Sequence, residues 1–142
     1  MSNYAVLIKD LMGISCLILL STAHAQSQPP PEARAFADRM VICNSHALML
    51  HMYAQGEVPA SVPERAEYRD LAYAAAGESY VAKRLASKDE MNKALQELEP
   101  LLNTKSIEGL TEEQKDEHTY AVWSKVIKSC NATAAKPPAK NQ

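Results

Sequence analysis

The stretch that decides the fold is residues 32–55, EARAFADRMVICNSHALMLHMYAQ. Its apolar side chains recur every three or four residues, the spacing that places them on one face of an α-helix. One apolar stripe consists of Phe36, Met40, Cys43, Ala47, Leu50 and Ala54. A second stripe lies beside it and consists of Ile42, His46, Met49 and Tyr53. We therefore predict a helix over residues 32–55 that stops at Gly56 and is the most buried element of the domain.

Three further helices are predicted along the chain. The second covers residues 63–86, because Pro63 suits a first helical turn, and it turns five side chains inward: Tyr68, Leu71, Ala75, Ala82 and Leu85. The third begins with a capping box at residues 87–90 and breaks or kinks at Pro100, with an apolar seam of Met91, Leu95 and Leu98. A second capping box at residues 111–114 opens the fourth.

These patterns contain no sustained alternation of apolar and polar residues, so they favour an all-α fold. We expect a small four-helix domain over residues 32–131, in an up-down-up-down bundle. The flanking segments, residues 26–31 and 132–142, are rich in Pro, Ala, Lys and Gln, and we expect them to be disordered.

The N-terminal 25 residues are typical of a secretory signal peptide. An apolar run from Leu11 to Ala23 precedes a cleavage pattern of small residues, Ala23-His24-Ala25. The run is shorter than the roughly 20 residues that span a bilayer, so we expect no membrane anchor after cleavage. The mature chain is then predicted to begin at Gln26 and to be periplasmic or secreted.

Export determines the expected state of the cysteines. Cys16 is lost with the signal peptide, which leaves Cys43 and Cys130 in an oxidising compartment. Cys130 shares the spacing of Tyr120, Trp123 and Ile127 on the apolar face of the last helix. We therefore predict one disulfide between the first and last helices, the alternative being two free thiols that bind a metal or act as nucleophiles.

The charge balance excludes one class of partner. The chain carries 15 Lys and Arg against 17 Asp and Glu, a net charge of −2, and loss of Lys9 and Asp10 with the signal peptide leaves this value unchanged. Such a balanced surface lacks the basic patch that nucleic-acid binding requires. We expect no nucleic-acid partner.

An alternative hypothesis is a metal site formed mainly by residues of the first helix. Thioether and imidazole groups suit copper, and a His–Met pair can hold a haem iron. The candidate ligands are Met40, His46, Met49, His51 and His118. Methionine at helical spacing is more typical of core filling, so our main prediction is no cofactor.

The sequence contains none of the usual catalytic signatures: we find neither Gly-x-Ser-x-Gly nor His-Glu-x-x-His, and no inward pair of carboxylates. Glu78 has functional interest only if it is buried. We expect a non-enzymatic protein that binds a macromolecular partner in the cell envelope, as inhibitors, immunity proteins and chaperones do. The connections over residues 57–63 and 103–110 are the candidate contact regions, with Glu57, Lys105 and Glu108 as candidate residues.

Overall fold

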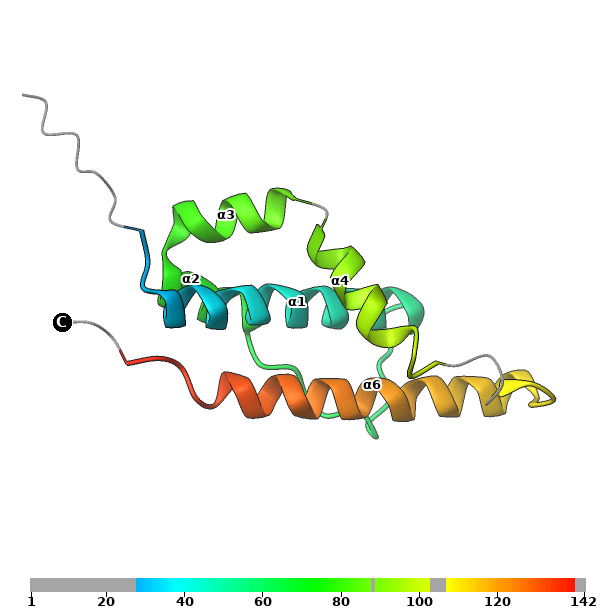
Figure 1. Ribbon diagram of the computed structural model, residues 1–142. Helices are drawn as coiled ribbons and strands as arrows, with labels where there is room; N and C mark the ends of the chain where they lie inside the picture. The colour runs from blue at the N-terminus through cyan, green and yellow to red at the C-terminus, as the bar shows by residue number, and fades with distance from the viewer. Residues whose placement is uncertain (1–27, 88, 103–106, 140–142) are drawn as a thin grey trace, which may run out of the picture.

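The computed structural model describes residues 28–87, 89–102 and 107–139, and this part of the chain is helical without strands (Figure 1). Its helices are α1 (Pro31–Tyr53), α2 (Tyr68–Ala76), α3 (Glu78–Ala86), α4 (Asp89–Leu98) and α6 (Glu112–Ala134). The all-α prediction is confirmed. The predicted signal peptide lies outside the described residues, and within them no helix is long and apolar enough to cross a membrane.

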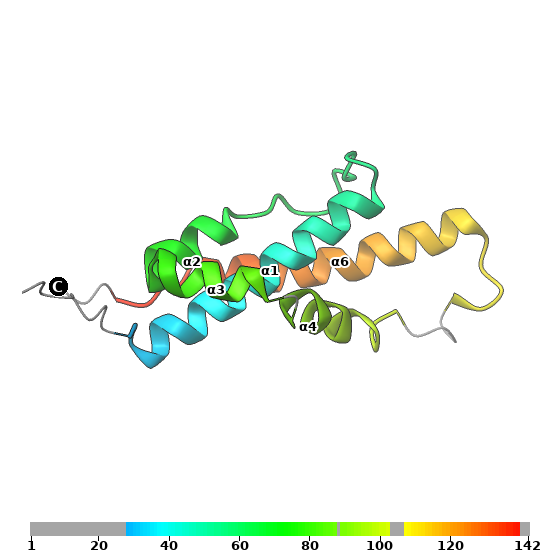
Figure 2. The same ribbon diagram turned by 90° about the horizontal axis from the view of Figure 1, so that it is seen from above.

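Helix α1 is the centre of the molecule, as expected, and each of the other four helices packs against it. Helix α6 runs antiparallel to it, and α2 and α3 lie along the half of α1 that begins at Pro31 (Figures 1 and 2). Helix α4 lies beside the other half. Both ends of the described chain are therefore at one end of the molecule, and we call the opposite end, where α1 and α4 finish, the distal end.

The predicted disulfide is present between α1 and α6. The sulfur atoms of Cys43 and Cys130 are 2.07 Å apart, and both residues are fully buried. The bond joins positions separated by 87 residues in the sequence. It therefore fixes the two long helices to each other at the middle of the core.

The predicted second helix is wrong in its extent, because residues 63–86 form two short helices. Gly77 separates α2 from α3 with φ 78° and ψ 160°, a backbone conformation that is essentially restricted to glycine. The break changes the phase of the pattern, so Val81 is buried whereas Ala82 and Leu85 are exposed. The expected four-helix bundle is consequently replaced by five helices in the described residues.

Helix α2 also starts five residues later than predicted, and Asn131 of α6 explains why. The Asn131 side chain accepts hydrogen bonds from the backbone N–H of Ala66 at 3.1 Å and from the Tyr68 hydroxyl at 2.6 Å, and it donates to the Glu64 carbonyl at 2.7 Å. These bonds hold the segment before Tyr68 against α6. A contact between distant parts of the sequence thus outweighs the local preference for helix.

The remaining helix ends follow the predicted signals closely. Helix α4 stops at Leu98, before Pro100, and the capping box of Thr111 and Gln114 at the start of α6 is formed. Helix α1 ends two residues earlier than expected, with Gln55 and Gly56 at positive φ. Helix α6 continues to Ala134, so residues 132–134 are helical rather than disordered.

Loss of the disulfide should destabilise the domain strongly. In the chain-entropy model, opening a loop of this length lowers the free energy of unfolding by roughly 4–5 kcal/mol. We expect the double variant Cys43→Ala, Cys130→Ala to show a shift of this order in urea denaturation of the mature protein. Reductant should shift the wild type in the same way and leave the double variant unaffected; two reactive thiols in folded protein isolated from cells would contradict the bond.

Candidate functional site

The residues proposed from the sequence as metal ligands do not converge on one place. Met40 is fully buried in the core, and Met49 forms part of a groove described below. His51 is exposed beside Gly56, and His118 is half-buried on α6. Within the described residues, no group of three or more His, Cys, Asp or Glu side chains is arranged to hold a metal ion.

His46 has a different role, in a polar cluster next to the disulfide. Its Nε2 lies 2.9 Å from Oε2 of Glu97 on α4, and Arg39 donates to both oxygens of the same carboxylate, at 2.6 and 2.8 Å. Nη2 of Arg39 is 3.9 Å from the sulfur of Cys130. This cluster connects α4 to α1 beside the disulfide bond that joins α1 and α6.

Burial determines the charge state of His46. Burial lowers its pKa from the ordinary value of 6.5, and the hydrogen bond with Glu97 opposes the shift without cancelling it. Nδ1 of His46 is buried without a hydrogen-bond partner, so a proton there would meet no acceptor. For Glu97, burial acts to raise the pKa, but the hydrogen bonds from Arg39 and His46 outweigh it and hold the pKa below 4.5.

A second ionic cluster connects α1, α3 and α4. The carboxylate of Glu90, 2% exposed, binds Nη2 of Arg84, whose Nε lies 3.0 Å from Asp38. Tyr80 donates to the same Asp38 at 2.8 Å. The glutamate expected to be of interest, Glu78, is exposed, and the buried one is Glu90, which the sequence presented as part of a capping box.

These two clusters set the rotation of α4 and correct the predicted apolar seam. Glu90 and Glu97 are seven residues apart and therefore lie on one face of α4, which both clusters turn toward α1 and α3. Leu98 is buried as predicted, but Leu95 is 50% exposed and Met91 only half-buried. The spacing of Glu90 and Glu97 was the signal for this face, but their arginine partners lie on other helices.

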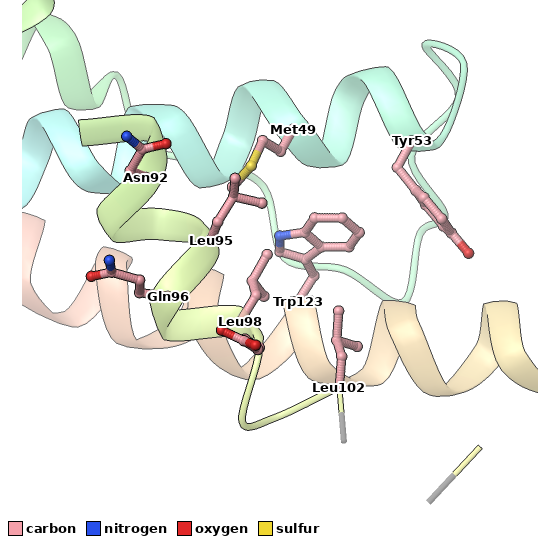
Figure 3. Close-up of a pocket in the computed structure, with 9 residues that line it drawn as sticks. Met49, Tyr53, Asn92, Leu95, Gln96, Leu98, Leu102 and Trp123 are labelled. Carbon is pink, nitrogen blue, oxygen red and sulfur yellow. The ribbon is translucent and has the colours of Figure 1, made fainter. Parts of the chain in front are cut away.

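Because α4 is rotated in this way, the side chain of Leu95 points outward and lines one wall of an apolar groove at the distal end, shown in Figure 3. The groove has a volume of about 700 Å³ and lies between α1, α4 and α6. Trp123 rises from α6 between Leu98 of α4 and Met49 of α1. We call this the distal groove; its lining residues are Met49, Tyr53, Asn92, Leu95, Gln96, Leu98, Glu99, Leu102 and Trp123.

Trp123 gives the groove a polar atom. The residue is 5% exposed, and its indole Nε1 is buried without a hydrogen-bond partner in the structure. Figure 3 shows this nitrogen directed toward α4, on the Leu95 side. An unpaired buried donor costs about 1–3 kcal/mol, which a ligand that offers an acceptor there recovers in part.

Tyr53, 42% exposed, stands at one end of the groove and connects it to an acidic neighbour. Its ring centroid lies 5.3 Å from that of Trp123 and 5.6 Å from that of Tyr120, and its hydroxyl donates to Asp116. Beyond Tyr53 is a polar cavity lined by Tyr53, Ala54, Gln55, Glu57, Asp116 and Tyr120. Tyr53 is therefore shared by an apolar surface and an acidic one.

The three residues proposed as partner contacts come from two separate connections of the chain. Glu57 is exposed and lines the acidic cavity beside the groove, and Glu108 is exposed in the connection before α6. Lys105 lies outside the described residues. The expected contact segment 57–63 forms one wall of another pocket of about 780 Å³, which also includes Leu48, His51 and the oppositely charged pair Glu64 and Arg65.

Comparison of the chain with protein-family models, with curated proteins and with solved structures gives no match.

The buried His46 should make the domain less stable in mild acid. Below about pH 6.5, His46 is protonated in the unfolded chain but stays neutral in the folded state, because burial lowers its pKa there. The free energy of unfolding therefore falls as the pH falls. We expect His46→Gln to flatten this dependence between about pH 5 and about pH 7, measured by urea denaturation. The exposed His51→Gln variant should keep the wild-type slope, and an unchanged slope in His46→Gln contradicts the assignment.

Proposed function

We propose that the mature chain is an exported, non-enzymatic protein that binds a partner protein in the cell envelope through the distal groove. The observation that carries this proposal is the concentration of exposed apolar side chains in the distal half of the molecule, of which Tyr53 and Leu95 line the groove itself. Large hydrophobic residues are exposed at seven described positions, and six belong to the distal halves of α1 and α4 or the segments that follow them: Leu48, Met52, Tyr53, Val58, Leu95 and Leu101. The seventh is Leu85 on α3.

Such clustering is the reason to infer binding. Single exposed hydrophobic residues are normal on protein surfaces, but contiguous apolar patches mark sites of interaction. The groove adds a concave shape with Trp123 and Tyr53 in its walls, and these residue types are enriched where binding energy concentrates. A partner side chain inserted between α1 and α4 can cover the exposed part of Tyr53 and pack against Trp123, which is already buried.

The framework around the groove supports affinity for a second reason. Two walls of the groove, α1 and α6, are joined by the disulfide, and α4 is held to α1 through the bonds of Glu97. A surface that is rigid before binding loses less conformational entropy in the complex. The disulfide also fits the export predicted from the Leu11 to Ala23 segment, because such bonds persist in oxidising compartments.

Export has a direct test in the mass of the protein isolated from the periplasm or medium of producing cells. We expect the mass of residues 26–142 less the two hydrogens lost on disulfide formation. The Ala25→Arg variant disrupts the small-residue cleavage site and should accumulate as the precursor. An unprocessed wild-type chain that stays in the cytoplasm contradicts the proposed localisation.

The groove has a test by site-specific photo-crosslinking. A photoreactive phenylalanine analogue at Leu95, in the groove wall, should give one discrete adduct in producing cells. The same analogue at the exposed Leu85 on α3 should not. Adding Leu102→Asp should abolish the adduct, because a charge in an apolar contact is not solvated in the complex. Circular dichroism controls for folding of each variant.

Equal adducts from positions 95 and 85, or an adduct that survives Leu102→Asp in a folded protein, contradict binding at the groove.

A further inference from the structure

Within the described residues, the charged side chains that line the distal groove and the cavity beside it have one sign. Among the residues that line the groove, Glu99 is the only ionisable side chain apart from Tyr53, and the adjoining cavity adds Glu57 and Asp116. In the part of the chain that the structure describes, neither lining contains Lys, Arg or His. Lys115 on the neighbouring turn of α6 is paired with Glu112 at 2.6 Å. The apolar groove therefore has an acidic rim, formed by Glu57, Glu99 and Asp116.

We infer that the partner presents an apolar segment flanked by Lys or Arg, whose apolar side chains occupy the groove while the cations meet the acidic rim. This inference rests on the proposed function, and it specifies the chemistry of the partner. Tyr53 joins the two parts of the surface, since its ring lines the groove and its hydroxyl holds Asp116. A segment that crosses Tyr53 passes from apolar contacts to carboxylates.

The same charges argue against the two other occupants that an apolar surface suggests. Anionic lipid headgroups are repelled by an acidic rim, which makes a membrane surface a poor partner. In a twofold dimer of this chain through the groove, the rim carboxylates of both copies would face each other, and like charges juxtaposed at an interface are costly. A basic, apolar protein segment avoids both penalties.

The test uses two synthetic helical peptides with the same leucine positions, spaced i, i+3, i+4 and i+7. One carries Lys at the flanking positions and the other carries Glu. Each is titrated into the mature, disulfide-bonded protein, and emission of Trp123 is followed, because it is the only tryptophan of the chain. We expect saturable binding of the Lys peptide with a Kd about tenfold lower than that of the Glu peptide, the combined effect of three exposed ion pairs.

Variants of the protein separate charge from apolar contact. Glu57→Gln with Glu99→Gln should reduce the preference for the Lys peptide to about two- or threefold. The matched pair Glu67→Gln with Glu78→Gln, which removes exposed carboxylates at the ends of α2 and α3, should leave it unchanged. Leu95→Ser should weaken binding of both peptides by about tenfold, and Leu85→Ser should weaken neither.

Each remaining outcome overturns the inference in a distinguishable way. If both peptides bind with equal affinity and binding still depends on Leu95, the partner needs no basic flank, although binding at the groove itself is supported. If neither peptide binds, the inference fails, and crosslinking at Leu95 decides the proposed function independently. A change of Trp123 emission with vesicles of phosphatidylglycerol, or concentration-dependent self-association in sedimentation, assigns the groove to lipid or to a second copy instead.

Discussion

The bond between Cys43 and Cys130 is the constraint on which the rest of the structure depends. It fixes α1 against α6 at the centre of the core, and the polar cluster of Arg39, Glu97 and His46 is built beside it. A domain of this size buries a core of limited area, so a covalent link between its two longest helices contributes a large share of the stability. The remaining helices are short and owe their positions to contacts with this pair.

Buried charge then determines the surface that the protein presents. Two carboxylates of α4, the buried Glu90 and the partly exposed Glu97, bind arginines of α3 and α1, and the burial of Glu90 is acceptable only because its partner is present. Pairing both carboxylates with arginines of the neighbouring helices fixes the rotation of α4, and that rotation directs Leu95 outward. The apolar groove over Trp123 is thus a consequence of electrostatic pairing elsewhere on the same helix.

This arrangement places stability and binding in adjacent but different parts of the molecule. The disulfide and the His46 cluster hold α1, α4 and α6 together, whereas the distal ends of the same helices carry the exposed apolar side chains and the acidic rim. Contacts made by the exposed groove residues Tyr53, Leu95 and Glu99 can therefore change without loss of the core, whereas Met49, Leu98 and Trp123 belong to both. The described ends of the chain lie at the opposite end of the molecule from the groove.

The sequence by itself determined the helical class, the central position of α1, the disulfide and the capping box of α6, because helical periodicity, cysteine number and capping are local properties. The late start of α2 and the inward face of α4 were decided by the tertiary structure, whereas the break between α2 and α3 uses the backbone conformation that Gly77 allows. Asn131 binds a backbone segment more than 60 residues away, and Arg39 and Arg84 select the buried face of α4 from other helices. Apolar spacing favoured Leu95 for the core; only the long-range pairing of Glu90 and Glu97 with arginines placed it in the groove.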